Sequence, residues 1–151
     1  ARLMCERFGL ERVRFTNSGT EANLMAITAA RQLTERPKVL VFHGGYHGGV
    51  LFFSDGVAPW NAPYEFVVAP YNDLAASAAL IDEHADGLAA VLVEPMLGSG
   101  GCIPATPEFL GGVFEACPLS RDAATRRSHP VERADAAARG CAERQRVSVS
   151  A

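Results

Sequence analysis

The chain has 151 residues, of which 48% are hydrophobic and 21% are charged, and its formal net charge at pH 7 is −3. This length and composition are typical of one globular domain with its own core. The small negative charge gives no basic surface for nucleic acid, and no apolar run approaches the roughly 18 residues that a membrane-spanning helix needs.

The first part of the chain alternates between helix and strand patterns. Residues 3–8 are typical of the last turns of a helix, which Gly9 ends. Alternating side chains predict a short strand at residues 13–15, and apolar residues at three- and four-residue spacing predict a helix at residues 22–33. Arg36-Pro37 closes that helix.

Three apolar runs then predict buried strands, at residues 39–42, 66–68 and 89–93. Asn72 or Asp73 is expected to cap an alanine-rich helix that ends near His84. Thr106-Pro107 has the cap and first-turn proline of a later helix. This alternation indicates an α/β fold with a largely parallel sheet, in which these three strands are interior.

A small polar turn joins the strand predicted at residues 13–15 to the helix that follows. It lies within Phe15-Thr16-Asn17-Ser18-Gly19-Thr20-Glu21-Ala22-Asn23. The first amides of a helix lack partners and carry the positive end of its dipole, so such a turn can bind an anion such as phosphate. Gly19 permits close approach, and the Ser18 and Thr20 hydroxyls can add donors. The alternative is that Ser18 or Thr20 only caps the helix.

The last 34 residues differ in composition from the rest. All twelve aromatic residues precede Pro118, whereas seven arginines follow it among many alanines. Either residues 118–151 are a disordered tail, or they are not the protein's own evolved sequence.

Four widely spaced cysteines, without a Cys-x-x-Cys pair, indicate reduced thiols, a cytoplasmic setting and no bound metal. They are Cys5, Cys102, Cys117 and Cys141. The first residues do not begin like a signal peptide, and the chain does not start with Met, so we expect it to start inside a longer protein.

Three motifs occur in order along the chain. After residues 15–23 come His43-Gly44-Gly45-Tyr46-His47-Gly48-Gly49 and Val91-Leu92-Val93-Glu94-Pro95-Met96-Leu97-Gly98. Over residues 3–110 the chain resembles the class III aminotransferases, which are fold-type I enzymes that depend on pyridoxal 5'-phosphate. Within them it is similar to the β-amino-acid (β-phenylalanine type) aminotransferases and to the glutamate-1-semialdehyde aminomutases.

The resemblance implies that residues 1–117 form part of a three-layer α/β large domain that binds the cofactor. Ser18, Gly19 and Thr20 are expected to hold its phosphate. Tyr46 is expected to stack on its pyridine ring, with a core aromatic as the alternative. Residues 118–151 are then interpreted as a disordered tail, or as the product of a frameshift or of translation into an intron.

Two further residues of the motifs receive roles in the same way. His47 is expected to stand beside the cofactor, although a lone histidine is more often a structural hydrogen-bonder. Glu94, at the end of a buried strand, is expected to contact substrate or a network beside the cofactor, or to cap the strand. His43 and Cys102 are interpreted as structural.

The residues that perform the family's chemistry have no counterpart. The family needs a Schiff-base lysine and an aspartate on the pyridine nitrogen. The one lysine, Lys38, precedes a buried strand and reads as surface charge, while Asp122 and Asp135 lie among Ala and Arg.

The resemblance implies amino-group transfer between an amino acid and a keto acid by a homodimer. We expect no nucleic acid or membrane partner. Because the Schiff-base lysine and the aspartate are missing, we expect this chain to be inactive. The alternatives are a fragment of an aminomutase, or a non-catalytic module that binds cofactor or a second subunit.

Overall fold

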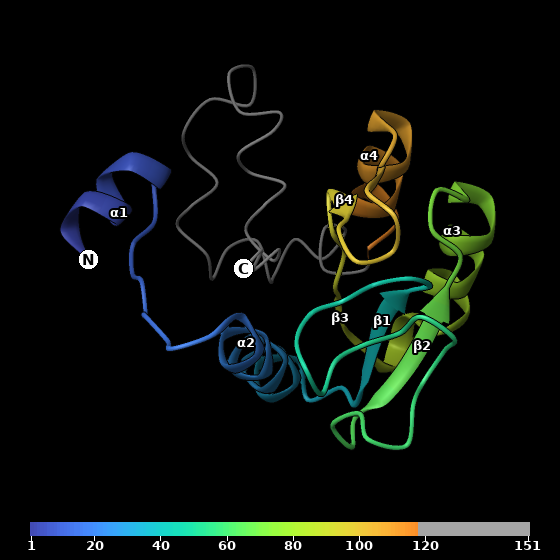
Figure 1. The fold of residues 1–151 in the computed structure, drawn as a ribbon, viewed down its shortest axis with the longest axis horizontal. Helices are drawn as coiled ribbons and strands as arrows, with labels where there is room; N and C mark the ends of the chain where they lie inside the picture. The colour runs from blue at the N-terminus through green and yellow to red at the C-terminus, as the bar shows by residue number, and fades with distance from the viewer. Residues whose placement is uncertain (118–151) are drawn as a thin grey trace.

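The computed structural model describes residues 1–117 (Figure 1). Residues 118–151, including the predicted tail, lie outside the described residues. The helices are α1 (Arg2–Phe8), α2 (Gly19–Thr34), α3 (Leu74–Glu83), α4 (Pro107–Ala116) and the 3-10 turn η1 (Ala85–Gly87). The strands are β1 (Lys38–Phe42), β2 (Glu65–Ala69), β3 (Leu88–Val91), β4 (Met96–Leu97) and β5 (Ile103–Pro104).

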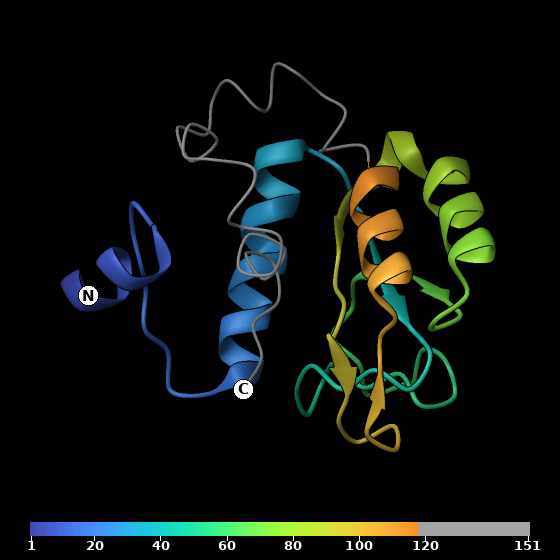
Figure 2. The same cartoon turned by 90° about the horizontal axis from the view of Figure 1, so that it is seen from above.

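Strands β1, β2 and β3 form a parallel sheet in the order β2-β1-β3. Helix α2 covers one face of this sheet, and α3 and α4 lie together on the other (Figure 2). The described residues therefore form a three-layer α/β arrangement: the alternating elements predict its parallel sheet, and the family resemblance implies its three layers. Strands β4 and β5 form a separate antiparallel pair around the glycine-rich loop at residues 98–101.

Strand β1 is buried on both faces, as its continuous apolar run predicts. Leu40 and Phe42 pack against α3 and α4, together with Ile81 and Phe109. Val39 and Val41 point to the opposite face, where Ile27 of α2 joins them. Because successive side chains of a strand alternate between faces, these few residues contribute to two separate cores.

The long connection between β1 and β2 contains no helix, yet it closes the α2 side of the sheet. Leu51 and Phe53 lie within it and are fully buried against Val39 and Val41. This packing brings residues 43–49, which follow β1, close to the start of α2.

The helix ends agree with the capping residues in the sequence. Gly9 ends α1 in the left-handed conformation with φ 62°. Asp73, rather than Asn72, caps α3 by accepting from the Ala76 amide, and Thr106 caps α4 with Pro107 in its first turn. None of the helices in residues 1–117 is long and apolar enough to cross a membrane.

Three predictions about strands are wrong. Residues 13–15 form no strand, and Phe15 is exposed, because no neighbouring strand in the described part pairs with this segment. Within residues 1–117 only β1 has strand neighbours on both sides, so β2 and β3 are edge strands of the described sheet rather than interior ones. The third strand also ends at Val91, before residue 93.

The aromatic contacts of α4 give a test of the core beneath α3 and α4. Phe109 is 1% exposed and packs edge-on against Phe42 and Tyr71, with ring centroids 5.3 and 5.2 Å away. Phe109→Ala is expected to lower the free energy of unfolding by about 3–5 kcal/mol, measured by urea denaturation. Phe114→Ala removes a half-exposed ring from the same helix and should cost less than about 1 kcal/mol. Equal losses would contradict this packing.

Candidate functional site

The start of α2 is organised by short-range hydrogen bonds. The Ser18 hydroxyl accepts from the Glu21 amide at 3.2 Å, and the Glu21 carboxylate accepts from the Asn17 amide at 2.9 Å. These two reciprocal contacts resemble a capping box and fix the turn that enters the helix. The expected capping role of Ser18 is therefore present in the structure.

Capping leaves two amides of the first turn available. The amides of Gly19 and Thr20 make no hydrogen bond within the described residues, since neither has a carbonyl four residues earlier in the helix. Both point out of the end of a 16-residue helix, at the positive end of its dipole. This end of α2 can therefore bind an anion while Ser18 remains its cap.

The loop with Tyr46 and His47 lies directly against this helix end. The Thr20 hydroxyl oxygen accepts from the Gly49 amide at 3.2 Å, and the Asn23 side chain donates to the His47 carbonyl at 2.8 Å. Gly48 lies against Thr20 with φ +133°, a conformation and a closeness that suit only glycine. The first and second sequence motifs thus meet in space.

Glu94 of the third motif joins the same loop from the other side. Its carboxylate accepts from the Tyr46 amide at 2.7 Å and from the Gly98 amide at 3.1 Å. Its carbonyl accepts from the Tyr71 hydroxyl at 2.8 Å. The second and third motifs meet because they follow β1 and β3, whose carboxyl ends lie at one edge of a parallel sheet, and the start of α2 brings the first motif to the same edge.

Tyr46 and His47 are neighbours with opposite environments. The Tyr46 side chain is 47% exposed and contacts Phe52 edge-on, with ring centroids 5.6 Å apart. His47 is 6% exposed, and this burial lowers its pKa to about 4, although the Glu94 charge acts in the opposite direction. The site therefore presents a phenol ring to solvent and keeps a neutral imidazole behind it.

Tyr71 is linked to the site through the Glu94 carbonyl. Burial, and then the negative charge of Glu94, raise the pKa of its hydroxyl to about 12. The phenol therefore stays protonated at neutral pH and remains a donor to the Glu94 carbonyl.

The structure brings together all six site residues named from the sequence: Ser18, Gly19, Thr20, Tyr46, His47 and Glu94. It also adds Asn23, which sequence reasoning missed. Asn23 is 1% exposed, and its Oδ1 atom is buried without a partner in the described part. A polar residue four positions before the buried Ile27, on the core-facing side of the helix, was the signal available in the sequence.

The residues interpreted as structural lie outside this cluster of contacts. The His43 ring lies 3.3 Å from the Ser54 carbonyl, and Cys102 is exposed in the loop between β4 and β5. Lys38 begins β1, and its ammonium lies 3.3 Å from the His84 ring nitrogen. It is therefore at the amino end of the strand, at the edge of the sheet opposite to the site.

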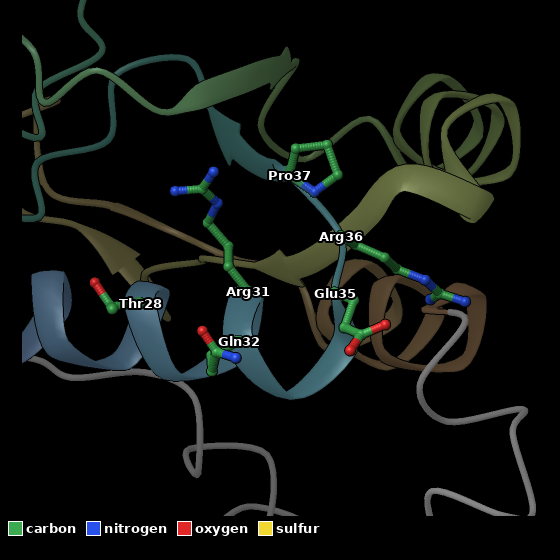
Figure 3. A pocket seen from close by; sticks show the side chains of 6 residues that line it. All are labelled: Thr28, Arg31, Gln32, Glu35, Arg36 and Pro37. Carbon is green, nitrogen blue, oxygen red and sulfur yellow. The ribbon is translucent and has the colours of Figure 1, made fainter.

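A hollow of about 440 Å³ lies at the other end of α2 (Figure 3). Its lining includes Arg31 and Arg36, whose side chains point away from each other in Figure 3. Arg31 lies over the Tyr64 ring, and Arg36 donates to the Leu88 carbonyl. Because the two guanidinium groups do not converge, this hollow has no arrangement for one anion.

The sequence matches the aminotransferase class-III family over residues 1–121. The chain belongs to the class III aminotransferases. Members of this family depend on pyridoxal 5'-phosphate (PLP), and one similar solved structure, described as a transaminase with PLP bound, is 37% identical with a TM-score of 0.62. That match covers 74% of this chain and 29% of the other.

Two named relatives carry related activities. The chain is 56% identical over 117 residues to the β-phenylalanine transaminase of Variovorax paradoxus, covering 77% of this chain. The crystal structure of the β-phenylalanine aminotransferase from that organism has a TM-score of 0.74, with 77% of this chain and 27% of that chain covered. Identity to the glutamate-1-semialdehyde 2,1-aminomutase of Dichelobacter nodosus is 43%, over 67% of this chain. The chain spans 27% of the length of each relative.

The approach of Gly48 to Thr20 gives a test of the contact between the loop and α2. A Cβ atom at Gly48 would lie 2.7 Å from the Thr20 Cα atom, so Gly48→Ala must move the loop or the helix. We expect a loss of about 1–3 kcal/mol in unfolding free energy and faster amide exchange at Gly49. Gly49→Ala is the matched control, since a Cβ there meets no atom within 4 Å. Similar effects of both substitutions would refute the close contact.

Burial of neutral His47 predicts a dependence of stability on pH. Its pKa is about 4 in the folded chain, below the ordinary value of 6.5, so the unfolded state binds more protons between these values. The stabilisation is complete above pH 6.5 and is lost as pH falls toward 4, up to roughly 3 kcal/mol. Urea unfolding across this range should show a smaller pH dependence for His47→Gln. An unchanged slope would contradict the buried neutral imidazole.

Proposed function

We propose that this chain carries the part of a transaminase cofactor site that holds the phosphate and one face of the pyridine ring. The observation that supports this most strongly is the pair of unpaired amides of Gly19 and Thr20 beside the loop with Tyr46. PLP, when bound, supplies an electron-accepting ring that allows an amino group to move between an amino acid and a keto acid.

The residues present fit a phosphate ester with an aromatic ring. The Gly19 and Thr20 amides would hold the phosphate, and the Ser18 and Thr20 hydroxyls can still donate their protons. The half-exposed Tyr46 ring offers a stacking surface worth roughly 0.5–1.5 kcal/mol beyond its buried area. His47 supports the loop as a neutral group beside the cofactor, so the phosphate gains no charge pairing from it.

Among residues 1–117, no lysine lies at the proposed site to serve as the base that amino transfer needs. Its single lysine, Lys38, lies at the amino end of β1, whereas the site lies beyond the carboxyl end. Five strand residues separate these ends by roughly 13 Å, which is beyond hydrogen-bond reach of the site. We therefore assign amino transfer to the longer protein and propose that the 151-residue chain is inactive.

The identity to a β-phenylalanine transaminase favours an amino acid, and specifically a β-amino acid, as the amino donor, with a keto acid as acceptor. A cytoplasmic homodimer without a nucleic acid or membrane partner is part of the same proposal. The similarity to a glutamate-1-semialdehyde 2,1-aminomutase supports a second candidate, an aminomutase with the same cofactor cradle. A non-catalytic module that binds the cofactor without lysine is the third.

The experiment is to incubate the purified 151-residue chain with PLP, β-phenylalanine and 2-oxoglutarate or pyruvate. We expect weak cofactor binding and no turnover above that of free PLP, because the base and the covalent link are missing. Turnover above this background would refute the proposed inactivity. A borohydride-stable cofactor adduct mapped to Lys38 would do the same.

A Ser18→Ala/Thr20→Ala variant serves as the control for the binding site. It removes both hydroxyls of the helix start and should abolish the weak binding of PLP. Unchanged binding would show that the Ser18 and Thr20 hydroxyls do not hold the cofactor.

A further inference from the structure

The loop that carries Tyr46 is held by a carboxylate far away in the sequence. Glu94 accepts the Tyr46 amide with one oxygen and the Gly98 amide with the other, at 2.7 and 3.1 Å. Hydrogen bonds from backbone amides to an ionised carboxylate are short and about twice as strong as neutral ones. Glu94 therefore links the Tyr46 loop to the loop that follows β4.

The same loop is held from the opposite side by α2. Asn23 donates to the His47 carbonyl at 2.8 Å, and the Thr20 hydroxyl accepts from the Gly49 amide at 3.2 Å. Positions 20 and 23 are three residues apart and so lie on one face of the helix. The backbone from Tyr46 to Gly49 is thus bonded at three successive places to two separate elements.

The Tyr46 side chain depends on this backbone for its position. It is half exposed, and the ring contact that holds it in the described structure is the one with Phe52. A ring that is fixed before a ligand arrives loses less conformational entropy on binding. The geometry of the backbone contacts therefore bears directly on stacking.

We propose that Glu94 and Asn23 are positioning residues that hold the Tyr46 ring in line with the α2 start. This inference rests on the proposed cofactor site and goes beyond it by naming the side chains that give affinity for a ring beyond that for phosphate. Neither residue needs to touch the ligand, because both act through the Tyr46 loop.

Glu94→Gln is the most informative substitution. It keeps the shape of the side chain but offers one accepting oxygen, so its amide group faces one of the two backbone amides as a second donor. Glu94→Gln should therefore release either Tyr46 or Gly98 without opening a cavity. Glu65→Gln is the matched control, because Glu65 is exposed at the amino end of β2.

Two probes separate ring binding from phosphate binding in the 151-residue chain. Pyridoxine 5'-phosphate contains both ring and phosphate and has no aldehyde to react with Lys38, and inorganic phosphate contains only the anion. We expect Glu94→Gln and Asn23→Ala to weaken binding of pyridoxine 5'-phosphate roughly 2- to 10-fold, the range of one stacking contact. Binding of inorganic phosphate and the behaviour of Glu65→Gln should be unchanged.

A double variant tests whether Glu94 acts through Tyr46. Tyr46→Ala should produce a similar loss, and Tyr46→Ala/Glu94→Gln should lose no more than Tyr46→Ala alone. Amide exchange gives a readout without ligand: Glu94→Gln should accelerate exchange at Tyr46 or Gly98 while Leu40, in the core strand, stays protected.

The outcomes distinguish the two proposals. If the unsubstituted chain binds neither probe, the proposed cofactor site is wrong and the positioning role falls with it. If it binds both, but Glu94→Gln weakens both equally, or the double variant shows additive losses, only the positioning role is refuted. Faster exchange at Leu40 as well would show that Glu94 supports the whole fold instead.

Discussion

Burial of β1 on both faces determines where the other described elements lie. Its alternating side chains form one core with α3 and α4 and another with α2, so the strand cannot shift by one residue without exchanging both sets. Helix α2 runs into the amino end of β1, which places the Ser18 end of the helix beside the carboxyl end of the strand. The candidate site lies there because a helix start and three strand ends share one edge of the molecule.

The chemistry of this edge consists of fixed dipoles and neutral donors. The α2 amides and two hydroxyls can bind an anion, while the buried His47 is neutral and Lys38 lies at the opposite edge. The carboxylates beside the site accept from backbone amides, Glu94 from those of Tyr46 and Gly98 and Glu21 from that of Asn17. Within residues 1–117 these groups suit the phosphate ester with a ring that we propose as ligand, and no lysine lies among them.

The positioning role that we propose for Glu94 rests on its structural contacts. Its carboxylate and carbonyl together hold three segments, through Tyr46, Gly98 and Tyr71. Glu94 is expected from the sequence to contact substrate or a network beside the cofactor, or to cap the strand, and its carboxylate holds the loop that carries the aromatic ring.

The sequence by itself determined the places of the three parallel strands to within two residues, most of the helix caps and the family. These depend on local properties: the continuous apolar run in β1, the Thr106-Pro107 pair and the order of the motifs, whereas only the structure chose Asp73 over Asn72 as a cap. The tertiary structure decided which strands are neighbours, why residues 13–15 form no strand, and how Asn23 and Glu94 hold the Tyr46 loop. Each of these depends on a partner that is distant in the chain, and no local pattern specifies such a partner. Tyr46 and Glu94, for example, are 48 residues apart.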